Sequence, residues 1–197
     1  TGEERFLSSA KLALAYERNL FDETVGNWPD LRDLTTAVDA KNFMTSWCHG
    51  APGIGLSRLS ICSTKLWDEY CIEELQHASK ATYEMLKTNS GGTDHICCGT
   101  IGLIVALQEM ISSTSLISND LMSAIEQVIS NRINNVLSRC MSPELELRCF
   151  GTSEGSLMLP GFFTGLSGMA MGLLPDKRSR MITLSLMTAG LWDQKTF

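Results

Sequence analysis

The sequence predicts an all-α protein built from helical hairpins that are joined by glycine-rich turns. A short motif with two glycines occurs three times, at residues 49–56, 98–105 and 164–171. The segments between the motifs place apolar residues at the three- and four-residue spacing of amphipathic helices. No segment alternates apolar and polar residues strictly enough to predict a β-strand. Together these three observations favour the all-α class.

The three copies of the motif share one pattern. Each begins with a small or metal-binding residue and a glycine, followed by two residues, a second glycine and an apolar run. The first glycines are Gly50, Gly99 and Gly165, so the copies are 49 and then 66 residues apart. Repeats of this length are typical of stacked supersecondary units. We therefore expect each unit to contain a turn, a buried inner helix, a connection and an amphipathic outer helix.

The periodic segments follow one another in a simple order. An opening helix covers roughly residues 3–20 and ends before a loop that contains residues 27–30. A second helix runs to about Lys87, and one of its faces carries Trp67, Cys71, Leu75, Ala78, Thr82 and Met85. A third begins at the capping cluster 118–120, and one of its faces carries Leu121, Ile125, Val128, Ile129, Ile133, Val136 and Leu137.

The number of hairpins predicts an incomplete ring. The chain contains three such hairpins, or nearly four if the opening helix is counted, whereas closed α/α toroids contain about six or seven. We therefore expect residues 1–197 to form a single partial domain, about half of an α/α toroid. The first residue, Thr1, is not a methionine, which suggests that the chain is cut from a longer protein.

Composition and charge argue against several classes of protein. The formal net charge is −6 and the one tight basic run is residues 177–180, so no nucleic-acid partner is expected. No apolar stretch reaches the ~18 residues of a transmembrane segment, and the charged opening residues do not form a signal peptide. A cytoplasmic location is the expectation that follows.

Cysteines gather at the glycine turns. Of the seven cysteines, Cys48 lies two residues before Gly50, and Cys97 and Cys98 directly precede Gly99. An odd number without a secretory signal does not indicate a disulfide framework. In a radial repeat the equivalent turns lie at the same end, so we expect these three thiols to converge. Three thiolates can bind zinc at ~2.3 Å, and a catalytic zinc keeps its fourth position open.

Other interpretations of these residues stay open. The three cysteines can instead be unrelated buried thiols, because their spacing is not the paired C-x-x-C pattern of a structural zinc site. His49 and His95 lie beside the cysteines and are further candidate ligands. A histidine near such a turn is, however, more often a hydrogen-bonded structural residue.

The same residues resemble the motifs of the lanthionine synthetase C-like cyclases. Residues 46–56 resemble the family's Trp-Cys-x-Gly-x-Pro-Gly motif, and residues 95–99 resemble its second zinc motif in the Cys-Cys-Gly form of a subgroup. Residues 160–170 resemble its late Phe-x-x-Gly-Leu-Ser-Gly segment. Residues 27–31 resemble the bifunctional class II lanthipeptide synthetases in particular. The ordered motifs span most of the chain and correspond to the C-terminal half of the family's cyclase domain.

The resemblance implies a specific activity. Members fold as an α/α toroid with Zn²⁺ at one end, and by position the ligands here would be Cys48, Cys97 and Cys98. They add the Cys thiols of a dehydrated precursor peptide to dehydroalanine or dehydrobutyrine, which gives thioether rings. His49 would be the catalytic acid or base at the zinc, since imidazole exchanges protons near neutral pH, or else a residue that orients a ligand.

Parts of the family pattern are absent from this sequence. The family's upstream acid/base histidine and aspartate have no counterpart here, so the upstream half of the domain is expected as a partner. One alternative is an inactive, zinc-stabilised helical module that binds a peptide or a thiol. Another is a metal-free α/α repeat, which would place pairs of acids at the ring's mouth. Asp94 and Glu154 are the acids expected near the turns, so this last alternative is the least favoured.

Overall fold

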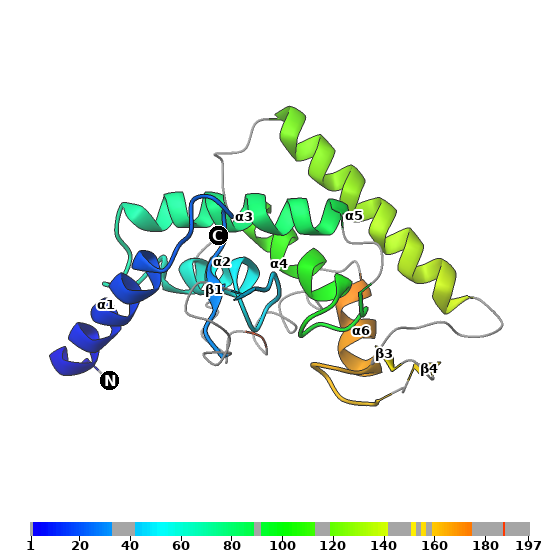
Figure 1. The fold of residues 1–197 in the computed structure, drawn as a ribbon, viewed down its shortest axis with the longest axis horizontal. Helices are drawn as coiled ribbons and strands as arrows, with labels where there is room; N and C mark the ends of the chain where they lie inside the picture. The colour runs from blue at the N-terminus through cyan, green and yellow to red at the C-terminus, as the bar shows by residue number, and fades with distance from the viewer. Residues whose placement is uncertain are drawn as a thin grey trace.

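The computed structural model describes residues 2–32, 42–88, 92–112, 119–141, 151–152, 155–156, 159–174 and 187. Helices dominate this part of the chain, which confirms the predicted all-α class (Figure 1). The helices are α1 (Glu4–Asn19), α2 (Ala51–Ile61), α3 (Tyr70–Thr88), α4 (Thr100–Ser112), α5 (Asn119–Cys140) and α6 (Leu166–Leu173). None of the helices in the described ranges has the length and apolar character that crossing a membrane requires.

Two small antiparallel ladders accompany the helices, so the expectation that the chain has no strands was wrong. Strand β1 (Pro29–Asp30) pairs with β2 (Asn42–Phe43), and β3 (Gly151–Thr152) pairs with β4 (Gly155–Ser156). Each strand has only two residues, which is too short to produce a detectable alternation of apolar and polar residues. The β1–β2 ladder matters for the site because it fixes the segment that ends in Asp30.

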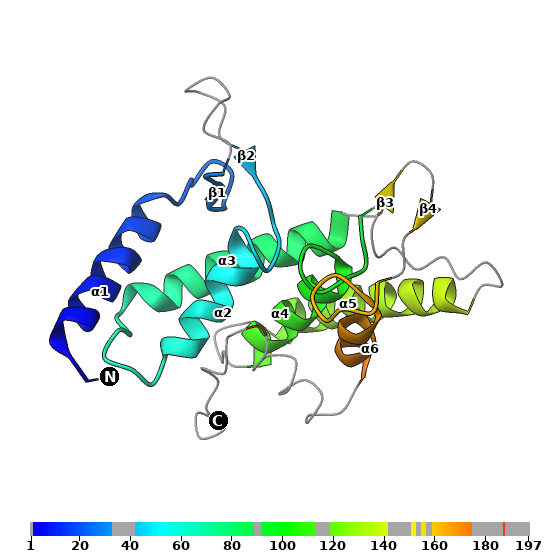
Figure 2. The ribbon, with the colours of Figure 1, turned by 90° about the horizontal axis from the view of Figure 1, so that it is seen from below.

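The helices form two layers. Helices α2, α4 and α6 lie in a row (Figure 2), and α3 and α5 lie along one side of it, above the row in Figure 1. Helix α4 occupies the middle of the row and is buried along most of its length, as its apolar composition predicts. It meets α2 so closely that a Cβ on Gly55 would lie 2.1 Å from Met110 Sδ, and one on Gly172 of α6 would lie 2.4 Å from Ile101 Cγ2. The pairs α2–α3 and α4–α5 are the predicted hairpins, with α6 as a further inner helix.

The internal repeat is also a repeat of backbone geometry. In each copy the second glycine packs against the carbonyl oxygen of the residue six positions earlier. A Cβ on these glycines would lie 2.2 Å from Trp47 O, 1.9 Å from Ile96 O and 1.8 Å from Phe162 O, for Gly53, Gly102 and Gly168 respectively. Because no side chain fits at such distances, the motif requires glycine at this position.

Helix α1 is attached to the two layers through ion pairs. It has no buried residue. Its Arg18 Nε lies 2.9 Å from Glu74 Oε1 of α3, and its Glu17 Oε2 lies 3.0 Å from Nη1 of Arg58 in α2. Arg58 is fully buried and its Nε lies 2.9 Å from Glu74 Oε2. Glu74 is therefore the shared anion of two guanidinium groups.

Replacing Glu74 with glutamine is expected to destabilise the fold by about 3 kcal/mol at pH 7, because it leaves the buried Arg58 charge poorly compensated. Burial alone would raise the pKa of Glu74, but Arg18 and Arg58 outweigh it and hold the pKa below 4.5. The carboxylate therefore stabilises the fold fully above about pH 4.5 and loses this effect as the pH falls further. Urea unfolding at pH 7 and pH 3 measures this difference.

The matched control is Glu73→Gln. Glu73 is 69% exposed, and its Oε1 lies 3.6 Å from Nε2 of His77 on the same helix. Its replacement should change stability by less than about 0.5 kcal/mol. Equal losses in the two variants at pH 7 would show that Glu74 has no special role.

Candidate metal centre

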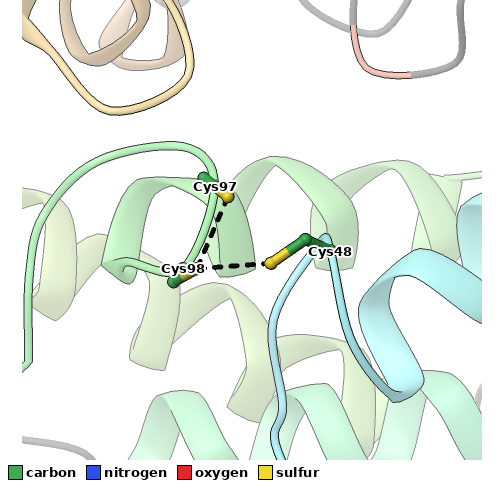
Figure 3. A group of neighbouring side chains, drawn as sticks. All are labelled: Cys48, Cys97 and Cys98. Atoms are coloured by element: carbon green, nitrogen blue, oxygen red, sulfur yellow. Dashed lines mark hydrogen bonds between the residues drawn. The ribbon is translucent and has the colours of Figure 1, made fainter. Parts of the chain in front are cut away.

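The turns that precede α2 and α4 bring three thiols together. Cys48 Sγ lies 3.3 Å from Cys98 Sγ, and Cys98 Sγ lies 3.4 Å from Cys97 Sγ. All three sulfur atoms lie within 4.8 Å of one another. Figure 3 shows the side chains converging from two separate turns. Residues about fifty positions apart in the sequence thus form one cluster, as the repeat predicts.

The cluster has the donor set and the spacing of a thiolate metal site. Sulfur atoms around a tetrahedral zinc, at ~2.3 Å from it, lie about 3.8 Å apart, so small shifts of these side chains would suffice. Thiolates favour soft or borderline metals such as Zn²⁺ and Cu⁺ over Mg²⁺ or Ca²⁺. Three protein ligands leave one tetrahedral position for a further ligand. The group could therefore hold a metal ion with an open position.

Electrostatics in the cluster favour a bound cation. Burial opposes ionisation of Cys48, but hydrogen bonds from Ser46, Cys98 and Cys97 outweigh it and lower the pKa of Cys48. The pKa values of Cys97 and Cys98 are raised, in both cases first by burial. Cys98 and Cys48 raise the pKa of Cys97 further, and Cys48 raises that of Cys98, although the hydrogen bond with Cys97 opposes this rise. Ionisation is therefore easiest at Cys48, and the negative charge of its thiolate opposes ionisation of the other two thiols. A metal cation would remove this penalty for all three.

Asn27 holds the first turn in place. Its Oδ1 accepts hydrogen bonds from the Ala51 amide at 2.9 Å and the Trp28 amide at 2.8 Å. Its Nδ2 donates to Thr45 Oγ1 at 2.9 Å. Gly50 has a φ of +85°, and a Cβ there would lie 2.0 Å from Met44 O, so this turn needs glycine for its backbone conformation.

His49 faces a carboxylate at the edge of the cluster. Its Nδ1 lies 3.6 Å from Asp30 Oδ1. Hydrogen bonds from Arg32 hold the pKa of Asp30 at about 2, so this carboxylate is ionised at neutral pH. Asp30 was not among the acids expected near the turns, although it lies in the segment that resembles class II synthetases. Nothing in residues 27–31 alone places that segment against the first turn.

Of the two acids that were expected near the turns, the structure describes Asp94. Asp94 is buried and forms an ion pair with Arg139 of α5. Glu154 lies outside the described residues. Asp94 is thus engaged with a cation of the outer layer rather than paired with a second acid at the thiol cluster.

His95 forms part of the second turn. The Cys98 amide donates a hydrogen bond to its Nδ1 at 3.2 Å, and the Gly99 amide donates to its carbonyl oxygen at 2.9 Å. Burial lowers the pKa of His95, which is consistent with a neutral ring that accepts at Nδ1. Among the described residues, neither His95 nor His49 belongs to the thiol cluster. Of its two interpretations, metal ligand or hydrogen-bonded structural residue, the structure supports the second for His95.

The third turn supports the cluster without adding a thiol. The carbonyl oxygen of Phe163 accepts a hydrogen bond from the Cys97 amide at 2.9 Å. The Phe163 ring stacks on the Trp47 ring, with 4.7 Å between the centroids and an interplanar angle of 13°. The turn before α6 therefore contacts both cysteine turns: it bonds the backbone of Cys97 and packs against Trp47, which directly precedes Cys48. The sequence did not suggest this role.

A cavity of about 540 Å³ opens beside Cys48 along α2. Its walls combine apolar groups with hydroxyls and one carboxylate, from Glu17, Trp47, Cys48, His49, Gly50, Gly53, Ile54, Leu56, Ser57, Ser60 and Met187.

Of the other cysteines, Cys71 is buried in the helix stripe predicted for it, Cys62 and Cys140 are half-buried, and Cys149 lies outside the described residues.

Fold and site together define a helical-hairpin protein with a three-thiol cluster that could bind a metal. A family model for lanthionine synthetase C-like proteins matches residues 1–179. The chain therefore belongs to the lanthionine synthetase C-like family. No curated protein and no solved structure matched the chain.

Proposed function

We propose that the chain is part of a zinc-dependent cyclase, of the class II kind, that forms thioether rings in a dehydrated precursor peptide. The reaction adds a cysteine thiol to dehydroalanine or dehydrobutyrine. The convergence of Cys48, Cys97 and Cys98 on one point is the observation that carries this proposal. The family match supports it, because cyclisation of this kind is the chemistry after which the family is named.

The three cysteines would hold the metal, and the fourth ligand would be the substrate thiol. Zinc in this position would supply a positive charge that stabilises a substrate thiolate at neutral pH. The cavity beside Cys48 gives the substrate chain a place next to the cluster. Its mixture of apolar walls and serine hydroxyls suits a peptide segment of low charge.

His49 would carry the proton of the reaction. The substrate thiol loses a proton, its sulfur forms a bond to the β-carbon, and the electrons of the C=C bond move towards the carbonyl group. The α-carbon then takes up one proton, so His49 can accept the proton from the thiol and return it to carbon. Asp30, whose carboxylate faces Nδ1, would stabilise the protonated ring in between.

The test is a cyclisation assay with a dehydrated peptide that contains one cysteine and one dehydroalanine. Ring formation does not change the peptide's mass, so alkylation of the remaining free thiol is followed by mass spectrometry. We expect the alkylated fraction to fall with time when the zinc-loaded chain is present together with the upstream half of the domain. Tight binding of the peptide without loss of its thiol would contradict the proposal and favour a binding module.

A further inference from the structure

The first two turns hold equivalent backbone amides in the same way. When the two copies are aligned on Gly50 and Gly99, Ser46 corresponds to His95. The side chain at this position accepts a hydrogen bond from the amide three residues further on. The distances are 3.3 Å from the His49 amide to Ser46 Oγ and 3.2 Å from the Cys98 amide to His95 Nδ1. The equivalent residue of the third turn is Gly161, which has no side chain to offer.

The two turns differ in which residue is held. In the first turn the restrained amide belongs to His49, which is not part of the thiol cluster. In the second turn it belongs to Cys98, whose sulfur contacts both other thiols. In the second turn, His95 stands where the first turn has Ser46. It therefore holds the backbone of Cys98, which is a residue of the thiol cluster. His95 is only 4% exposed, so its ring has little freedom to move away.

We propose that His95 is a positioning residue that holds Cys98 in the orientation required for metal binding. This inference rests on the metal centre of the proposed function. Because the Cys98 amide donates to Nδ1, the proton of the neutral ring is carried by Nε2. Fixing the amide of Cys98 limits rotation about its backbone and so directs its Sγ towards Cys48 and Cys97. His95 does not contribute a ligand atom.

The remaining contacts of the second turn support this role. The turn is closed on both sides of Cys98, by the Gly99 amide on His95 O at 2.9 Å and by the Cys97 amide on Phe163 O at 2.9 Å. The three successive amides of residues 97–99 are therefore all bonded, and one of these bonds goes to a side chain. A substitution at His95 removes that one bond while the two backbone bonds remain available.

Two substitutions separate positioning from simple packing. His95→Leu fills much of the space but accepts no hydrogen bond. His95→Asn is smaller, but its Oδ1 can accept close to the place of Nδ1. We expect zinc affinity, measured by competition with a chelator, to fall about 10- to 100-fold in the leucine variant and only a few-fold in the asparagine variant. Unchanged affinity in the leucine variant, or the reverse order of the two, would overturn the proposal.

Amide exchange in the metal-free chain gives a readout that needs neither zinc nor activity. We expect the Cys98 amide to be protected in the parent chain and in His95→Asn, and to lose protection in His95→Leu while the helix amides keep theirs. Equal protection in all three chains would also overturn the proposal. A parent chain that binds no zinc would remove the proposed function, and exchange at Cys98 would then decide alone whether His95 holds the turn.

Discussion

Replacing His49 with phenylalanine should slow ring formation about 100-fold or more without loss of zinc, because proton transfer by a positioned side chain contributes a factor of this size. The backbone of residue 49 is bonded to Ser46 at both its amide and its carbonyl group. These bonds do not depend on the side chain, so the turn should persist in the variant. The rate is measured as loss of free thiol from the dehydrated peptide, with zinc content determined on the same preparation.

The control for this substitution is His49→Tyr. Tyrosine has a similar ring and an O–H group that can donate a proton, whereas phenylalanine has none. We expect the tyrosine variant to keep more activity than the phenylalanine variant. If the phenylalanine variant cyclises the peptide at the parent rate, His49 is not the proton carrier and its role is confined to orienting a neighbouring group.

Replacing Gly102 with alanine should destabilise the fold by about 3 kcal/mol and weaken zinc binding, because the clash of the new Cβ outweighs the gain in helix propensity. Alanine in a helix interior is favoured over glycine by about 1 kcal/mol. Against this, the new Cβ would lie 1.9 Å from Ile96 O and 2.8 Å from Ile96 C. Ile96 directly precedes Cys97, so relief of the clash must displace the turn that carries two of the three thiols.

Gly161→Ala is the control for the clash. A Cβ on Gly161 would have no atom within 4 Å, and its φ lies outside the left-handed region. Its replacement should therefore change the free energy of unfolding by less than about 0.5 kcal/mol. A Gly102→Ala variant that is as stable as the parent, or more stable, would show that the turn can move freely, contrary to the geometry described above.

The repeat in the sequence was enough to predict the helices and the meeting of the cysteines. The apolar periodicity predicted α3 and α5 because both helices have one buried and one exposed face. The end of α3 and the start of α5 lie where it placed them, but Trp67, which was expected on the face of α3, precedes that helix. Glycine spacing located the turns because Gly53, Gly102 and Gly168 all meet a carbonyl oxygen six residues earlier. Helix periodicity and glycine spacing both depend on residues that are close together in the chain, so the sequence alone reveals them.

The groups around the cluster were harder to foresee because they depend on contacts between distant segments. Asp30 reaches His49 because Asn27 bonds the first turn to the segment that precedes β1 and because β1 pairs with β2. Phe163 supports Cys97 through its carbonyl oxygen, a group that every residue has and that no sequence pattern reveals. His95 was a candidate ligand on spacing alone, and only the direction of the Cys98 amide distinguishes a positioning role.

Zinc content per chain decides whether Cys48, Cys97 and Cys98 form a metal centre. Elemental analysis of the purified chain should give close to one zinc ion per molecule, and Cys98→Ala should lose most of it, because Cys98 Sγ contacts both other thiols. Cys71→Ala is the control, since Cys71 is buried in α3 and belongs to a separate part of the fold. A well-folded parent chain without zinc, or a Cys98→Ala variant that keeps it, would contradict the assignment of these three cysteines as a metal centre.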